Sequence, residues 1–152
     1  MKWRVALSEA GNSSPVISGD RIFLTQPNTE KKLRGLLCLD RKSGKTLWEK
    51  SVEYDAKERT HRTNHFCSSS PATDGERVIV AYGSAGIYCY SVDGRELWRR
   101  DLGTIDHVWG YGSSPLIYEN LCIHYHGPGK GPALVALDKK TGEIIWRFDE
   151  PI

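Results

Sequence analysis

A turn followed by a tryptophan recurs three times in this sequence and constrains the fold more than any other feature. The copies are CLDRKSGKTLW, CYSVDGRELW and ALDKKTGEIIW, which end at Trp48, Trp98 and Trp146. The three tryptophans follow one another at intervals of 50 and 48 residues. Self-similarity at a fixed period of this size is typical of propellers and solenoids.

A second marker, Ser-Ser-Pro, opens each unit at Ser13, Ser69 and Ser113. Between the two markers, short apolar segments alternate with turns, and no segment has a sustained helical period. Asp-Gly pairs, which are typical of tight hairpins, occur at 74–75 and 93–94. In the second unit the expected strands are Ala72–Thr73, Arg77–Tyr82, Ile87–Val92 and Glu96–Arg100. Four antiparallel strands repeated at this period indicate the blades of a β-propeller.

The predicted fold class is therefore all-β, a partial β-propeller with four-stranded antiparallel blades: about three blades plus an orphan N-terminal strand. Residues 1–152 form one repeat segment, with blade units at about 13–51, 69–101 and 113–149. The segment KWRVAL, which contains Trp3, precedes the first Ser-Ser-Pro. We therefore interpret residues 1–8 as the outer strand of a preceding blade.

The repeated residues have structural interpretations. Glycine permits the backbone conformation that a tight turn needs, and a tryptophan ring can lie across the junction to the next blade with its N–H on a carbonyl oxygen. Asp40 and Asp138 can accept backbone N–H groups within their turns. The structural repeat set is Gly44, Trp48, Gly94, Trp98, Asp138, Gly142 and Trp146.

The pattern Ala136-x-Asp138-x-x-Thr141-Gly142-x-x-x-Trp146 resembles the tryptophan-docking motif of the pyrroloquinoline-quinone (PQQ) repeat propellers. The third unit matches the motif at every position, whereas the first has Cys38 and Ser43 in place of Ala and Thr. The second unit is one residue shorter and has Ser91 at the Asp position. The resemblance covers essentially the whole chain and is greatest to the secreted or periplasmic PQQ-like repeat proteins of bacteria.

Quinoprotein dehydrogenases of this superfamily use adjacent cysteines, a tryptophan beneath the quinone, and Glu, Asn and Asp around a calcium ion. This sequence has no Cys-Cys pair and no such acidic set at recognisable spacing. We therefore carry over no catalytic residue and predict no cofactor and no metal; PQQ is implied by the family name alone. The cysteines lie mostly in apolar runs, which favours buried free thiols, although a disulfide between any pair stays open. They are Cys38, Cys67, Cys89 and Cys122.

Composition excludes several partner classes. Lys and Arg number 21 against 19 Asp and Glu, a net charge of +2, which gives no reason to propose nucleic acid or an anionic membrane. No apolar run is long enough for a membrane span, and the first residues lack the apolar core of a signal peptide. A closed propeller needs about four to eight blades. The expected partners are therefore the remaining blades of a longer chain, or a second copy, and the resemblance places the parent protein in the periplasm or outside the cell.

The alternation of strand direction puts the long connections on one face of the propeller. These connections are expected at 26–35, 53–68, 103–112 and 126–133. Long loops on a rigid scaffold are where binding residues concentrate, so we predict a ligand or partner face there. Its candidate residues are His61, His65, His107, Trp109, His124 and His126. Polar loop packing, lining of the central channel and a metal site made from four of these histidines are the alternatives.

The favoured function is a non-catalytic propeller segment that acts as an interaction scaffold within a larger extracytoplasmic protein. The alternative is part of a quinoprotein oxidoreductase whose site is completed by further blades. The absence of a catalytic set from the sequence favours the first.

Overall fold

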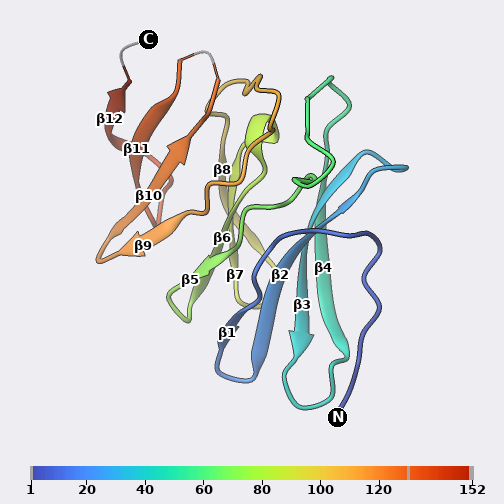
Figure 1. The fold of residues 1–152 in the computed structure, drawn as a ribbon. Helices are drawn as coiled ribbons and strands as arrows, with labels where there is room; N and C mark the ends of the chain where they lie inside the picture. The colour runs from blue at the N-terminus through green and yellow to red at the C-terminus, as the bar shows by residue number, and fades with distance from the viewer. Residues whose placement is uncertain (1, 130, 151–152) are drawn as a thin grey trace.

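The computed structural model describes residues 2–129 and 131–150, and in them three four-stranded antiparallel sheets stand side by side (Figure 1). In each sheet the spatial order of the strands follows their order in the chain. The first sheet comprises β1 (Val16–Ser18), β2 (Arg21–Asn28), β3 (Leu33–Asp40) and β4 (Thr46–Glu53). The second comprises β5 (Ala72–Thr73), β6 (Arg77–Ala81), β7 (Ile87–Ser91) and β8 (Glu96–Arg100), with a 3-10 turn, η1 (Gly83–Ala85), between β6 and β7. The third comprises β9 (Leu116–Tyr118), β10 (Leu121–His126), β11 (Ala133–Asp138) and β12 (Ile144–Asp149). The all-β partial propeller predicted from the repeat is confirmed.

The loop expected over 26–35 is much shorter than predicted. The β2–β3 ladder continues to Asn28 opposite Leu33, so only residues 29–32 remain outside the strands. The ladder extends this far because Pro27 and Arg34, which pair across it, are both buried. Their burial keeps the ends of both strands in the core.

The N-terminal segment pairs with no strand of the described chain. Residues 2–7 form no strand, because no neighbouring strand in the described part of the chain offers them a ladder. They contact the first blade through side chains instead, with Val5 packing against Leu24, Leu37 and Leu39. Met1 lies outside the described residues, and the assignment of 1–8 to a preceding blade stays a prediction.

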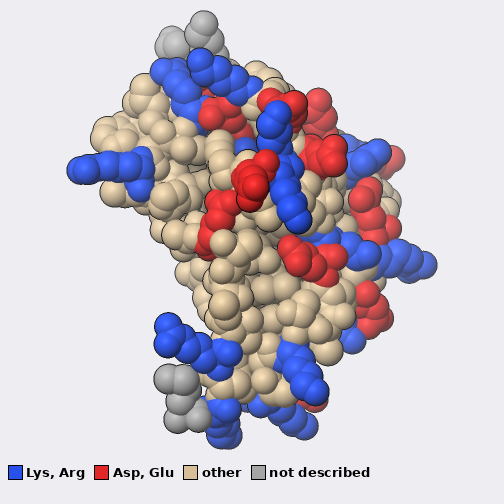
Figure 2. All heavy atoms as spheres, turned by 90° about the vertical axis from the view of Figure 1, so that its right-hand side faces the viewer, with Lys and Arg blue, Asp and Glu red and all other residues tan. Residues whose placement is uncertain are grey.

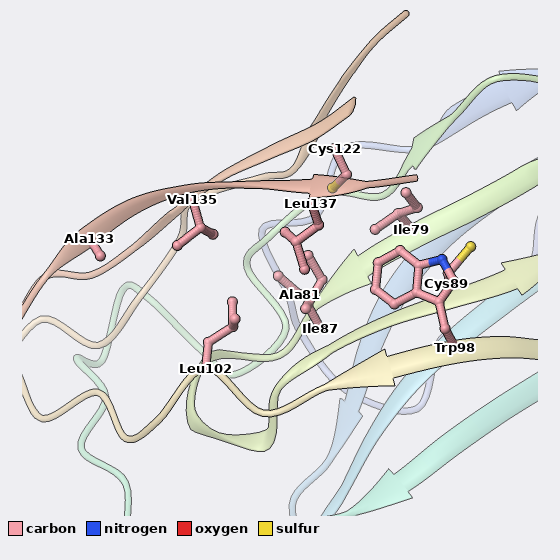
Figure 3. Packing of buried hydrophobic residues seen from close by; sticks show 10 residues of the cluster. All are labelled: Ile79, Ala81, Ile87, Cys89, Trp98, Leu102, Cys122, Ala133, Val135 and Leu137. Atoms are coloured by element: carbon pink, nitrogen blue, oxygen red, sulfur yellow. The ribbon is translucent and has the colours of Figure 1, made fainter. Parts of the chain in front are cut away.

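Hydrophobic side chains fill the two junctions between neighbouring blades. At the junction of the first and second blades, Phe23, Leu36 and Cys38 face Val78 and Val80. At the junction of the second and third blades, β11 turns Val135 and Leu137 toward the second blade, as Figure 3 shows. Period-2 alternation gives each central strand two apolar faces, one for each neighbouring blade.

A tryptophan–glycine contact recurs at each blade. The ring of Trp48 lies on Gly94, and the ring of Trp98 lies on Gly142. A methyl group on either glycine would come within 2.9 Å and 2.6 Å, respectively, of the indole, so glycine is required for this approach. The indole N–H of Trp98 donates to the Lys139 carbonyl at 2.9 Å, and that of Trp48 donates to the Val92 carbonyl at 3.0 Å.

Trp3 makes the same contact without belonging to a strand. Its ring lies on Gly44, and its indole N–H donates to the Arg41 carbonyl at 3.1 Å. The N-terminal segment therefore covers the first blade where a preceding blade would pack.

The second serine of each Ser-Ser-Pro forms a further link between blades. The Ser14 backbone N–H donates to Ser70 Oγ at 2.8 Å, and the Ser70 N–H donates to Ser114 Oγ at 2.9 Å. The repeated serines thus join successive blades just before their innermost strands.

The far face of the third blade is uncovered. Trp146 is 39% exposed and Phe148 is 62% exposed, whereas Trp98 at the equivalent position is 6% exposed. Leu116 and Tyr118 on β9 are exposed as well. This face is apolar because its strands have the composition of a blade junction. None of the described helical segments is long and apolar enough to span a membrane.

Candidate functional site

The long connections gather on one side of the molecule, the upper side in Figure 1, which we call the loop face. It comprises residues 29–32, 82–86 and 127–132, which join the second and third strands of each blade, and the blade-to-blade segments 54–71 and 101–115. Lys130 of the glycine-rich segment lies outside the described residues.

The two blade-to-blade segments bind each other. Asn64 Nδ2 donates to the carbonyl oxygens of Trp109 and Tyr111, at 2.6 and 3.1 Å. Arg59 Nε lies 2.6 Å from Asp106 Oδ1. Backbone oxygens held in this way fix the course of the second segment, although neither segment contains a regular strand.

Trp109 is the most prominent side chain that these contacts position. Its ring centroid lies 4.4 Å from that of His61, and its side chain is 56% exposed. The adjacent Val108 is 51% exposed. Tryptophan is among the residues enriched at the hot spots of protein interfaces. Trp109 is exposed and is also held in place by its neighbours.

The other loop histidines lie near this cluster. His107 Nδ1 accepts the Trp109 backbone N–H at 3.3 Å, and the His107 carbonyl accepts the Gly110 N–H at 2.9 Å. His65 is exposed, and its carbonyl accepts the Ser68 hydroxyl at 2.6 Å. The structure therefore brings His61, His107 and Trp109 together, with His65 on the same segment.

His124 and His126 belong to a different environment. They lie on β10 opposite Val135 and Ala133, two residues of the core between the second and third blades. They are 3% and 4% exposed, so they line neither the loop face nor an open channel. Burial, with a smaller contribution from His126, lowers the pKa of His124 to about 3, and burial lowers the pKa of His126 as well.

This separation removes the four-histidine metal hypothesis. His61 and His65 lie on an exposed loop, while His124 and His126 lie inside a blade junction. Within residues 2–129 and 131–150, no three His, Cys, Asp or Glu side chains are close enough to hold a metal ion.

The cysteines offer no activated nucleophile. All four are free and buried. Burial raises the pKa of Cys38 to about 11 and those of Cys67, Cys89 and Cys122 to about 12. Since the thiolate is the reactive form, these side chains behave as small apolar groups. No two of them are adjacent in the sequence.

Sequence reasoning missed a buried ion pair between Arg34 and Glu58. The Arg34 side chain is 3% exposed, and the Glu58 side chain is 2% exposed. Arg34 Nη2 lies 3.8 Å from Glu58 Oε2, and the guanidinium carbon lies 3.5 Å from the Phe66 ring centroid. Burial raises the pKa of Glu58, although hydrogen bonds from Ser84 and the charge of Arg34 act against it. An arginine inside the apolar run LRGLLCL was the available signal.

The strand order, the indole–glycine contacts and the gathered loops define a segment of a β-propeller of repeated four-stranded blades. The family model described as "Outer membrane protein assembly factor BamB" matches residues 1–65 and 33–151. The chain therefore belongs to the PQQ-like repeat β-propeller family. A search of curated proteins gave no significant match.

Solved structures share the fold at low sequence identity. A quinohemoprotein alcohol dehydrogenase from Pseudomonas putida HK5 superposes with a TM-score of 0.70 and 19% identity, covering 97% of this chain and 22% of that protein. The quinohemoprotein alcohol dehydrogenase from Comamonas testosteroni superposes with a TM-score of 0.70 and 15% identity, and the match covers 93% of this chain and 21% of that protein. BamB from Moraxella catarrhalis superposes with a TM-score of 0.60 and 16% identity, and the match covers 97% of this chain and 54% of that protein. The chain thus spans between about a fifth and about a half of the length of these proteins.

Proposed function

We propose that this chain is a non-catalytic propeller segment that binds a protein partner through its loop face, as part of a longer extracytoplasmic protein. The observation that carries the proposal is the exposed Trp109 side chain, seated on His61 and tied to the neighbouring segment by Asn64. Aromatic anchors on a rigid support dominate binding energy at protein interfaces. The family description, an outer membrane protein assembly factor, supports a role in protein assembly and a periplasmic location.

The chemistry of the site supports binding over catalysis. The histidines nearest to Trp109 bind backbone and hydroxyl groups of their own loops, as His107 and His61 do. The buried thiols are held in the unreactive protonated form. The short turns on the opposite face present mainly charged and glycine residues.

Site-specific photocrosslinking in the full-length protein tests the proposal. A benzophenone amino acid placed at Trp109 should give a discrete adduct in the extracytoplasmic fraction, and one placed at Lys42, in a turn on the opposite face, should give none. The adduct formed from a second loop position, His65, should disappear in the Trp109→Ala variant. Equal labelling from Lys42 and Trp109 would contradict a specific loop-face site.

The alternative function is part of a quinoprotein oxidoreductase, which the structural similarity to two alcohol dehydrogenases favours. Titration of the full-length protein with PQQ and calcium, followed by quinone absorbance and by turnover of primary alcohols, separates the two functions. A shifted quinone spectrum together with turnover would establish the alternative and displace the scaffold proposal.

A further inference from the structure

Two tight turns, residues 61–64 and 107–110, carry the exposed side chains around Trp109. In the first turn the Asn64 N–H donates to the His61 carbonyl at 2.8 Å, and in the second the Gly110 N–H donates to the His107 carbonyl at 2.9 Å. Both are the bonds between first and fourth residues that define a β-turn. The central residues of both turns are exposed, and we call them the twin-turn surface: Arg62, Thr63, Val108 and Trp109.

A histidine begins each turn and binds its third residue. His61 Nδ1 accepts the Thr63 backbone N–H at 3.4 Å and lies 2.8 Å from the Thr63 hydroxyl oxygen. His107 Nδ1 accepts the Trp109 backbone N–H at 3.3 Å in the same way. The segments HRTN and HVWG therefore hold their own shapes through equivalent contacts.

Gly110 allows the two turns to approach each other closely. A methyl group added there would lie 3.3 Å from the Arg59 carbonyl oxygen and 3.4 Å from Asn64 Nδ2. The same Asn64 amide donates to the Trp109 carbonyl, which joins the turns directly. A surface that is already assembled loses less conformational entropy when a partner binds.

Arg62 gives the twin-turn surface an unpaired positive charge. The segment 54–71 has two carboxylates, and both pair with cations of the β2–β3 hairpin. The pairs are Asp55 with Lys32 and Glu58 with Arg34. Asp106 of the second segment pairs with Arg59. The exposed Arg62 has no carboxylate partner in the described part of the chain, so its guanidinium is open to a partner's acceptor.

The surrounding surface adds no strong field of one sign. Figure 2 shows acidic and basic side chains interspersed over the upper part of the molecule's side. The charge that a partner has to match at the two turns is therefore that of a single arginine. A guanidinium presents a planar fork of N–H donors that fits a carboxylate.

We propose that the twin-turn surface recognises a protein segment in which an apolar side chain stands beside an Asp or Glu. The apolar side chain packs on Trp109 and Val108, and the carboxylate accepts hydrogen bonds from Arg62, which follows the histidine in contact with Trp109. The inference rests on the proposed function and names the chemistry of the partner at the same face.

NMR titration of the 152-residue chain with three capped peptides tests the inference. Gly-Asp-Phe-Asp-Gly carries both features, Gly-Asn-Phe-Asn-Gly lacks the carboxylates, and Gly-Asp-Gly-Asp-Gly lacks the apolar side chain. At millimolar concentration the first should shift the amides of residues 61–64 and 107–110. The second should bind about threefold more weakly, the effect of one exposed ion pair. The third should bind about tenfold more weakly, the effect of one aromatic contact.

Arg62→Gln separates recognition from a structural role. It should weaken the Asp peptide about threefold and leave the Asn peptide unchanged, because only the first has a carboxylate to lose. Loss of affinity for both peptides would mean that Arg62 supports the turn. Arg95→Gln is the matched control, since Arg95 is likewise exposed but lies in the β7–β8 turn on the opposite face. It should bind both peptides as the unmodified chain does.

The inference is overturned if the Asp peptide shifts neither turn, if the Asp and Asn peptides bind equally, or if acetate alone produces the same shifts. Photocrosslinking in the full-length protein distinguishes this failure from failure of the proposed function. A His65 adduct that is lost in Trp109→Ala but persists in Arg62→Glu supports the partner face and contradicts recognition of a carboxylate. The absence of any adduct from Trp109 or His65 contradicts the partner face itself.

Discussion

Gly142 shows how strongly one residue can limit this fold. Its φ is +71°, and a methyl group there would lie 2.6 Å from the Trp98 ring. We expect Gly142→Ala to lower the free energy of unfolding by about 2–5 kcal/mol, the sum of a left-handed non-glycine backbone and an overpacked contact. Chemical denaturation monitored by tryptophan fluorescence measures this change.

Gly19→Ala is the matched control, since Gly19 has a φ of +56° but nothing within 4 Å of an added methyl group. This variant should lower the free energy of unfolding by only about 1–2 kcal/mol, the cost of a left-handed backbone at a non-glycine residue. Equal losses for the two variants would show that the indole contact contributes nothing.

The two buried histidines make the junction of the second and third blades sensitive to acid. The pKa of His124 is lowered to about 3 from the usual 6.5, so the folded state binds fewer protons than the unfolded state below pH 6.5. The contribution of His124 to the free energy of unfolding is therefore fully present above pH 6.5 and is lost progressively as the pH falls toward the folded-state pKa. Between pH 7.5 and 5 we expect a loss of about 2 kcal/mol from His124, with a further loss from His126.

Denaturation midpoints across this pH range, compared with those of the His124→Leu/His126→Leu double variant, measure the effect. The double variant should show a much flatter dependence on pH. A dependence as steep as that of the unmodified chain would place the acid-sensitive group elsewhere.

At the scale of elements, the segment 2–8 acts as a cover for the first blade. Trp3 seats on Gly44, and Val5 packs on the outer apolar face of β2 and β3. Removing the indole in Trp3→Ala should destabilise this face by about 1–3 kcal/mol, the value of a partly buried aromatic side chain. Hydrogen exchange should accelerate in β2 and β3 and remain unchanged in β10 and β11.

Arg4→Ala alters the same segment at an exposed position and should leave exchange unaffected. If Trp3→Ala and Arg4→Ala gave the same exchange pattern, the segment would contribute nothing to the stability of the blade.

At the scale of the whole molecule, the uncovered face of the third blade governs behaviour in solution. Trp146 and Phe148 lie with Leu134 on an apolar sheet face that carries no covering blade in the described chain. Exposed apolar faces of this kind associate, so we expect the 152-residue chain to self-associate as its concentration rises. Sedimentation velocity should show a larger sedimentation coefficient at high concentration, and this increase should disappear in Trp146→Lys/Phe148→Lys. Trp109→Ala should associate like the unmodified chain.

The fold followed from the sequence because its determinants are local and repeated. The spacing of Trp48, Trp98 and Trp146 specifies four strands per unit, and the Asp-Gly turns specify the hairpins. The ends of β2 and β3 at the loop face could not be predicted from the sequence, because they depend on the burial of Pro27 and Arg34 in the folded structure. Residues 2–7 have no ladder partner in the described chain, so the assignment of 1–8 to a preceding blade stays a prediction.

The candidate site was only partly accessible from the sequence. The structure places His61, His107 and Trp109 on blade-to-blade segments that contact each other, and their role as a binding face stays a prediction. The structure places His124 in the junction between the second and third blades, because strand alternation allows either side of the sheet and only packing selects between them. Nothing in the spacing indicated that Glu58 folds back onto Arg34, 24 residues earlier in the printed sequence.

The tryptophan–glycine contact has a sense along the chain. The indole of each unit packs on the glycine of the unit that follows, as Trp48 packs on Gly94 and Trp98 packs on Gly142. A tandem duplication of one unit therefore supplies both halves of the new joint at once, and no existing surface has to change to receive it. The loop face takes no part in this contact, so its residues can change without breaking the joint.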